Sequence, residues 1–255
     1  FVAYEILQPS NLKKSTQFSN LEKYKFKTVF NKTVQKIDKN LFFCIFVILV
    51  LIAILLTAGP SFDIFFSSLF YKDNNQFLLQ SYYLITVLFR DVLLPIILVY
   101  TLVLPIISKL IPINKLYFGY NFSTKEILFV WTTLFINLIL IINLFLKNFW
   151  GRARPGDVLE LGGKGDFSSW YQISDACTSN CSFVSGDAAV GFSLIALYLV
   201  SNNLKYVYLS IIFGFSLGLI RIAEGGHFLS DVIFSAVIVF LFSFIIKKFF
   251  LNKFL

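Results

Sequence analysis

Charged residues and histidine are scarce in this chain of 255 residues. Asp, Glu, Lys and Arg make up 14% of it, against about 25% in soluble domains, whereas 57% of the residues are hydrophobic and 32 are Phe. This composition excludes an ordinary soluble domain and points to the bilayer. The chain also contains no Met and begins with Phe, so we expect a fragment or a trimmed chain, and no signal-peptide pattern stands near residue 1.

Several apolar runs are long enough, or nearly so, to cross about 30 Å of hydrocarbon as helices. We expect an all-α, polytopic membrane protein with a bundle of six transmembrane helices, at about 41–59, 80–108, 126–147, 185–202, 205–221 and 228–246. Residues 1–40 then form a basic N-terminal segment, and residues 41–250 form the membrane domain. Arg90 and Asp91 interrupt the second span; we expect this pair to satisfy itself or to anchor against another span, without a catalytic role.

Basic residues mark one side of this topology. Most lysines lie in the segment 1–40, in the loops after the second and fourth predicted spans, and at the C-terminal end. With six spans these regions share one side of the membrane, which the positive-inside rule makes the cytoplasmic side. We therefore expect both termini in the cytoplasm, in a cell inner membrane. The net charge of +8 reads as a topology signal, and no nucleic-acid partner is expected. Cys177 and Cys181 fall in an outer loop, where they form either a disulfide or two free thiols.

Three polar clusters fall on the outer side, although charged groups are costly in a bilayer. They are KNFWGRARP at 147–155, SGD at 185–187 and RIAEGGHFLSD at 221–231. Lys147, Arg152 and Arg154 offer N–H donors that match phosphate oxygens. Ser185 and Gly186 open a predicted helix, whose N-terminus either favours a bound phosphate or is simply capped by Ser or Asp.

His227 is the only histidine of the chain, and Asp231 follows it by four residues. On a helix this spacing places both side chains on one face, where the carboxylate holds the tautomer of the imidazole. Gly225 and Gly226 break the helix just before, so that Arg221 turns toward the same point. The alternative is an interfacial His–Asp pair, with Arg221 reaching to the lipid headgroups.

The spacing of these residues resembles the type 2 phosphatidic acid phosphatase superfamily. The resemblance rests on three motifs. In the first, six residues separate Lys147 from Arg154-Pro155, and the second is Ser185-Gly186. In the third, five residues separate Arg221 from His227, and three separate His227 from Asp231. The form WGRARP and the stretch 61–77 are similar to the subgroup that includes lipid A phosphatases. The resemblance implies a lipid phosphatase with its active site at the non-cytoplasmic membrane face. It also implies that His227 attacks phosphorus to form a phosphohistidine, that Asp231 orients it, and that these groups bind the phosphate: Lys147, Arg154, Ser185, Gly186 and Arg221.

The chain departs from this superfamily at three positions. Val184 replaces the usual Pro, Ile220 replaces the usual Ser, and Asp187 replaces the His that donates a proton to the leaving group. Asp187 is then either a protonated acid beside the phosphate or a base for the hydrolytic water. A third outcome is that the substrate needs little acid help, as a polyprenyl diphosphate or an anomeric glycolipid phosphate would. The fourth is a pseudoenzyme that binds phosphorylated lipids without cleaving them.

No cofactor is expected, and no metal, because positioning and charge neutralisation supply most of phosphoryl-transfer catalysis and the sequence has no His/Cys metal cluster. A lipid phosphotransferase would use the same phosphohistidine. A transporter would carry polar breaks near mid-bilayer in paired spans, whereas the charges here concentrate at one face. The expected partner is a phosphorylated membrane lipid, and the oligomeric state is left open.

Overall fold

A computed structural model describes residues 43, 46–52, 54, 61–72, 76–110 and 120–252. The chain divides into two units, residues 1–44 and 45–255. Of the first unit only Phe43 is described, and it is helical. The predicted basic segment 1–40 lies outside the described residues. So does much of the first predicted span, although residues 46–52 are helical as expected.

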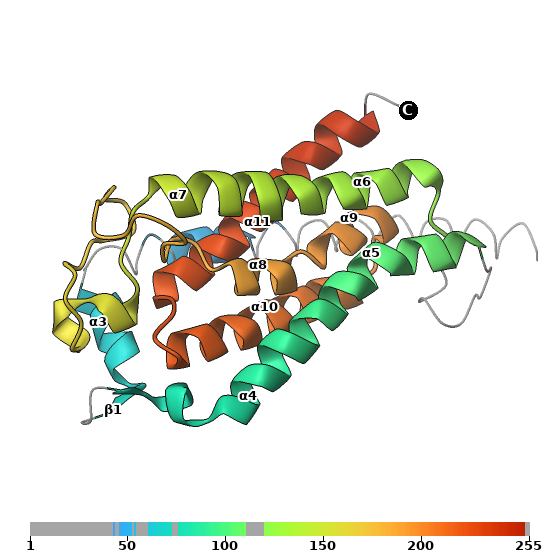
Figure 1. Cartoon of the computed structure of the whole chain (residues 1–255). Helices are drawn as coiled ribbons and strands as arrows, with labels where there is room; N and C mark the ends of the chain where they lie inside the picture. Colours follow the sequence, from blue (N-terminus) through green and yellow to red (C-terminus); the bar gives the residue numbers. More distant parts are fainter. Residues whose placement is uncertain are drawn as a thin grey trace, which may run out of the picture. The chain divides into compact units, whose positions relative to one another are not determined.

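Helices dominate the described part of the second unit, which confirms the all-α class (Figure 1). One antiparallel pair of two-residue strands, β1 (Tyr71–Lys72) and β2 (Gln76–Phe77), is the exception. The helices are α3 (Ser61–Ser68), α4 (Tyr83–Val87), α5 (Leu94–Leu110), α6 (Thr124–Leu134), α7 (Lys147–Phe149), α8 (Gly186–Phe192), α9 (Ile195–Ser201), α10 (Lys205–Ala223) and α11 (Leu229–Asn252). Short 3-10 turns cover Leu78–Ser81, Pro155–Asp157 and Leu159–Leu161.

Four helices in the described residues are long and apolar enough to cross a membrane. They run over Tyr83–Leu110, Thr124–Phe149, Lys205–Ala223 and Leu229–Phe250. The first joins α4 to α5 through a π-helical stretch, Leu88–Leu93, and the second joins α6 to α7 through another, Phe135–Leu146. These four match the second, third, fifth and sixth predicted spans.

The predicted fourth span differs from the structure. In place of one helix over 185–202, two short helices, α8 and α9, are separated by a turn at Ser193 and Leu194. The hydroxyl of Ser193 donates to the carbonyl of Val190 at 2.6 Å, inside the last turn of α8. Together the two helices make a shorter apolar segment, Gly186–Ser201, which is buried along nearly its whole length.

Helix α8 packs closely against α10, because two glycines face each other there. A Cβ atom on Gly191 would lie 2.5 Å from the backbone nitrogen of Gly214, and one on Gly214 would lie 2.3 Å from the ring of Phe192. Only hydrogen at these positions allows the two helices to touch backbone to backbone. Asp187 on α8 and Arg221 on α10 are thereby brought to the same end of the unit.

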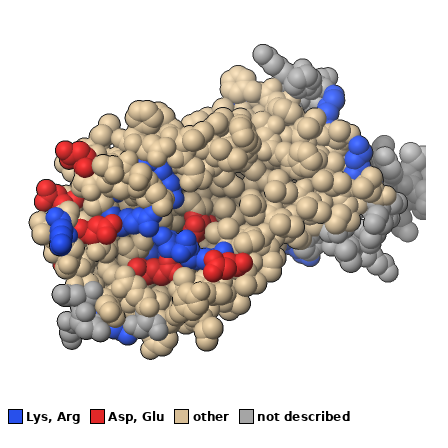
Figure 2. Space-filling model, viewed as in Figure 1, with Lys and Arg blue, Asp and Glu red and all other residues tan. Residues whose placement is uncertain are grey.

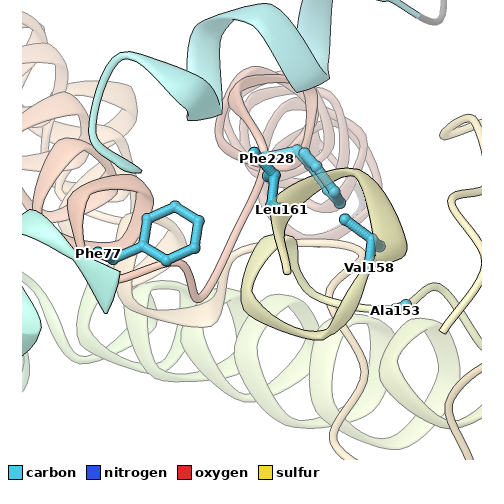
Figure 3. Packing of buried hydrophobic residues seen from close by; sticks show 5 residues of the cluster. All are labelled: Phe77, Ala153, Val158, Leu161 and Phe228. Atoms are coloured by element: carbon cyan, nitrogen blue, oxygen red, sulfur yellow. The ribbon is translucent and has the colours of Figure 1, made fainter. Parts of the chain in front are cut away.

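A buried apolar cluster fixes the loops at this end. It consists of Phe77, Ala153, Val158, Leu161 and Phe228 (Figure 3). Gly225 enters it with a φ of +73°, and a Cβ atom there would lie 2.5 Å from the ring of Phe77. The cluster therefore joins three distant segments and holds the short chain between α10 and α11 that contains His227.

Candidate active site

His227 lies in the turn before α11, not inside a helix. Its side chain is buried, with 1% of the residue exposed, and its Nδ1 lies 2.7 Å from the carbonyl oxygen of Ser182. A carbonyl only accepts, so Nδ1 carries the hydrogen and Nε2 keeps its lone pair. Burial lowers the pKa of the imidazole, and the carboxylate of Asp231 only partly offsets this effect. His227 is therefore arranged as a neutral base or nucleophile.

Asp231 lies within ion-pair distance of His227 but does not hydrogen-bond to it, and His227 precedes the helix, which corrects the expected pair on one helix face. Its nearer oxygen is 3.7 Å from Nδ1 of His227, too far for a hydrogen bond. That oxygen, Oδ2, instead accepts from the Ser182 hydroxyl at 2.5 Å and from the Phe228 backbone N–H at 2.8 Å. Asp231 thus holds the two segments that flank the imidazole, including the carbonyl that binds it.

Arg152 is fully buried and its N–H donors are taken by protein groups, contrary to the expectation that it offers donors to a phosphate. Its Nη1 donates to Asp231 Oδ1 at 2.6 Å, and its Nη2 donates to Asp63 Oδ2 at 2.8 Å. The guanidinium also lies 4.3 Å above the centre of the Phe228 ring. Arg152 is therefore the cation that two buried carboxylates share beneath His227.

Lys147 and Arg154 meet at Asn180. The ammonium of Lys147 donates to the Asn180 side-chain oxygen at 3.2 Å, and Nη2 of Arg154 donates to its backbone carbonyl at 2.7 Å. Asn180 lies inside the loop closed by a Cys177–Cys181 disulfide, so the disulfide alternative is the one the structure contains. Partial burial and repulsion from Arg221 lower the pKa of Arg154, since both disfavour its charged form.

Ser185 and Gly186 begin α8 as predicted. The buried Ser185 caps the helix, with its hydroxyl accepting from the Ala188 N–H at 3.4 Å. A Cβ atom on Gly186 would lie 3.4 Å from Nζ of Lys147, so the backbone here lies directly against the ammonium. The capping alternative is thus confirmed for Ser185, and phosphate binding at these amides stays a prediction.

Asp187 contacts two arginines through one oxygen. Its Oδ2 lies 3.1 Å from Nε of Arg90 and 3.3 Å from Nε of Arg221. Arg221 also pairs with Glu224 one turn further along. Of the two expectations for Arg90, anchoring against another span is therefore confirmed, because its partner is on α8. Four cations, those of residues 90, 147, 154 and 221, gather around this one carboxylate.

A cavity of about 420 Å³ lies beside these side chains. Arg154, Arg221 and Gly226 contribute to its wall, and Gly226 precedes His227 directly. Tyr83 and Thr86 from α4 line it as well, as do the carboxylates of Asp157 and Glu224. Charged side chains of both signs gather at this end of the unit on the face seen in Figure 2. The cavity is large enough for part of a phosphorylated headgroup.

Sequence reasoning missed four contributors to this site. They are Asp63, Arg90, Asn180 and Ser182, which lie outside the three polar clusters or were assigned no role. Arg90 carried a usable signal, because an arginine in an apolar span needs an anionic partner. The other three act through contacts that no local pattern marks.

Comparison with known proteins agrees with this geometry. The family model of the PAP2 superfamily matches residues 126–255, which is half of the chain and includes the three polar clusters. The chain belongs to the PAP2 superfamily. The superfamily is that of the type 2 phosphatidic acid phosphatases, so the resemblance read from the motif spacing is confirmed.

Curated relatives of this PAP2 protein carry one name. The lipid A 4'-phosphatase of Francisella tularensis subsp. novicida is 40% identical over 121 residues, which are 46% of this chain and 54% of that protein. The lipid A 4'-phosphatase of Rhizobium leguminosarum is 37% identical over 114 residues, 42% of this chain and 49% of that protein. The chain thus spans about half the length of the curated relatives it matches. No solved structure matches significantly.

Proposed function

We propose that this PAP2 protein is a membrane phosphatase that removes a phosphate group from a lipid headgroup. The observation that carries the proposal is the buried His227, whose Nδ1–H is fixed by the Ser182 carbonyl beside four clustered cations. The favoured substrate is a glycolipid phosphate of the lipid A type, since both relatives described above are named lipid A 4'-phosphatase. A polyprenyl diphosphate is the second candidate from the sequence.

His227 is the proposed nucleophile. Nε2 forms a bond to phosphorus, the ester bond to the headgroup oxygen breaks, and the departing oxygen takes a proton from solvent water. Water then attacks the phosphohistidine, which releases phosphate and restores the imidazole. Lys147, Arg154 and Arg221 stabilise the negative charge on the phosphoryl oxygens, so we propose that no metal ion is required.

Asp187 fits the second half of this reaction better than the first. Its Oδ2 accepts a hydrogen bond from Nε of Arg90 and forms an ion pair with Arg221, so this oxygen is already engaged by two cations. We assign it to the hydrolytic step, as the base that receives a proton from water. A headgroup that leaves without help from an acid would be the easier substrate.

Location follows from the same proposal. We propose an inner-membrane protein with the site at the extracytoplasmic face and both termini in the cytoplasm. The four apolar helices support membrane insertion, and the distribution of lysines supports the orientation. The disulfide in the loop above the site is compatible with an oxidising compartment.

The test is phosphate release by purified protein from three lipids: a lipid A-type glycolipid monophosphate, a polyprenyl diphosphate and phosphatidic acid. We expect the glycolipid to be hydrolysed fastest, and His227→Ala to lower kcat by at least about 10³-fold, as loss of a nucleophile does. Faster turnover of phosphatidic acid would contradict the substrate assignment, and an unchanged rate in His227→Ala would contradict the mechanism.

Two further outcomes separate the alternatives. If Asp187→His releases phosphate and the wild type does not, the natural protein is a binding pseudoenzyme. If added acceptor lipid becomes phosphorylated while free phosphate stays low, the protein is a phosphotransferase that uses the same intermediate.

A further inference from the structure

Arg90 lies in an apolar membrane helix, where a guanidinium is costly unless it has a function or a partner. The most apolar 18 residues of this helix, Tyr83–Leu110, have a mean hydropathy of 2.2, and Arg90 is within its π-helical stretch. It also lies outside residues 126–255, which the family model matches. The position of Arg90 therefore needs an explanation that the family match does not supply.

The partner of Arg90 is Asp187, 97 residues away in the sequence. Nε of Arg90 donates to Oδ2 of Asp187 at 3.1 Å, and this oxygen is shared with Arg221 at 3.3 Å. The Arg90 side chain is 42% exposed, whereas that of Arg221 is only 8% exposed. Arg90, the more accessible of the two arginines, thus contacts the same Asp187 oxygen as Arg221, but from the helix Tyr83–Leu110.

The carboxylate creates an electrostatic problem in a phosphate site. Lys147, Arg154 and Arg221 can attract a phosphate dianion, but the negative charge of Asp187 among them repels it. Without a further cation, Asp187 would also draw Arg221 away from the ligand. A second guanidinium on Asp187 weakens both effects, although Arg221 still pairs with Asp187 and with Glu224.

The helix of Arg90 borders the cavity of the site. Tyr83 and Thr86, seven and four residues before Arg90, line the cavity together with Arg154 and Arg221. At these spacings the three residues follow one side of the helix. Arg90 therefore lies on the side of the helix that faces the cavity, one turn beyond the residues that line it, and there it meets Asp187.

We propose that Arg90 is a positioning residue of the phosphate site. It neutralises and holds Asp187, so that Lys147, Arg154 and Arg221 remain available to the phosphate. Arg90, in the second predicted span, and Asp187, in the fourth, act as a pair without net charge. The proposal rests on the proposed function insofar as the site binds a phosphate group, but it does not require turnover.

The test is direct calorimetric binding of inorganic phosphate to the full chain in detergent, with four variants. Arg90→Gln should weaken phosphate binding about tenfold, which is about 1.4 kcal/mol. Arg90→Gln combined with Asp187→Asn should restore binding to within about threefold of wild type, because the uncompensated carboxylate is gone. Arg90→Lys, which keeps the charge, should bind nearly as wild type. Lys109→Gln removes a cation from the far end of the same helix, where Lys109 donates to Thr124, and should change nothing.

Each result either supports or overturns the proposal. Phosphate binding by Arg90→Gln equal to wild type overturns it, and so does a double variant that binds as weakly as Arg90→Gln, since that indicates a merely structural role. A wild type that does not bind phosphate overturns it too. With a lipid substrate, Arg90→Gln should raise KM more than it lowers kcat. If the binding results hold but no lipid is hydrolysed, the proposed function fails and this inference stands.

Discussion

His227 and the residues around it show how a nucleophile can be oriented by backbone. The carbonyl of Ser182 fixes the tautomer, and Asp231 fixes Ser182 through its hydroxyl. Arg152 pairs with Asp231 and also with Asp63, so the two carboxylates share one guanidinium. The imidazole therefore rests on a chain of buried polar groups, all of which must be paired to be stable.

The pKa of His227 leads to a prediction for the pH profile. Burial moves this pKa below the ordinary value of about 6.5, so the imidazole loses its proton at a lower pH than usual. The imidazole is then unprotonated at neutral pH. It becomes protonated, and so unable to attack phosphorus, only as the pH falls below about 6.5. We expect the acidic limb of kcat/KM against pH to lie below 6.5. An acidic limb centred above pH 7 would contradict this account.

Arg152 should contribute mainly to stability. Arg152→Met leaves Asp63 and Asp231 buried without their cation, and breaking a buried pair in this way costs about 3–5 kcal/mol. We expect a large fall in Tm in detergent, together with loss of activity. The matched control is Arg154→Met, two residues along the same loop. Because Arg154 is only partly buried, its loss should reduce activity with little change in Tm. Equal Tm values for the two variants would contradict these roles.

Among the elements, α8 and α10 determine the distance between Asp187 and Arg221. Their contact at Gly191 and Gly214 has no room for a side chain. A substituent on Gly191 must push the helices apart, since the obstructing atoms are backbone atoms of Phe213 and Gly214, whereas one on Gly214 would meet the ring of Phe192. The geometry of the site thus depends on a contact within the helix bundle.

Gly191→Ala tests this dependence. The added methyl group would overpack the contact, at a cost of about 1–3 kcal/mol, and would move α8 relative to α10. We expect a lower Tm and weaker binding of inorganic phosphate. The control is Ile212→Ala on α10, where the side chain is 57% exposed and should tolerate truncation. Wild-type phosphate affinity in Gly191→Ala would argue against the role of this contact.

The long helices could be predicted from the sequence, but the short ones could not. An apolar run of about 20 residues has few alternatives to a spanning helix, so four spans were found with ends near the observed ones. The break at Ser193 lies within a uniformly apolar stretch and depends on packing against α10 and α11. Helix α3 was missed because its contribution to the site depends on Asp63. That residue pairs with Arg152, 89 residues away, and such a contact leaves no local pattern in the sequence.

For the whole molecule, the order and spacing of three motifs predicted most of the candidate site. Lys147 and Arg221 lie at the ends of long helices, Arg154 lies in the loop after α7, and His227 lies just before α11, so the four side chains come together at one end of the unit, while their roles stay predictions. The spacing could not show that Arg152 points inward or that Arg90 reaches Asp187. Those outcomes depend on how separate segments pack, which a linear motif does not contain.

The central claim is that this assembly of helices transfers a phosphoryl group to His227. The most direct measurement is acid-free rapid quenching of the purified protein with a glycolipid substrate carrying labelled phosphate, followed by mass spectrometry of its peptides. We predict transient, alkali-stable label on the peptide that contains His227, and none in His227→Ala. Steady phosphate release by a His227→Ala protein, or label on a different residue, would contradict the account.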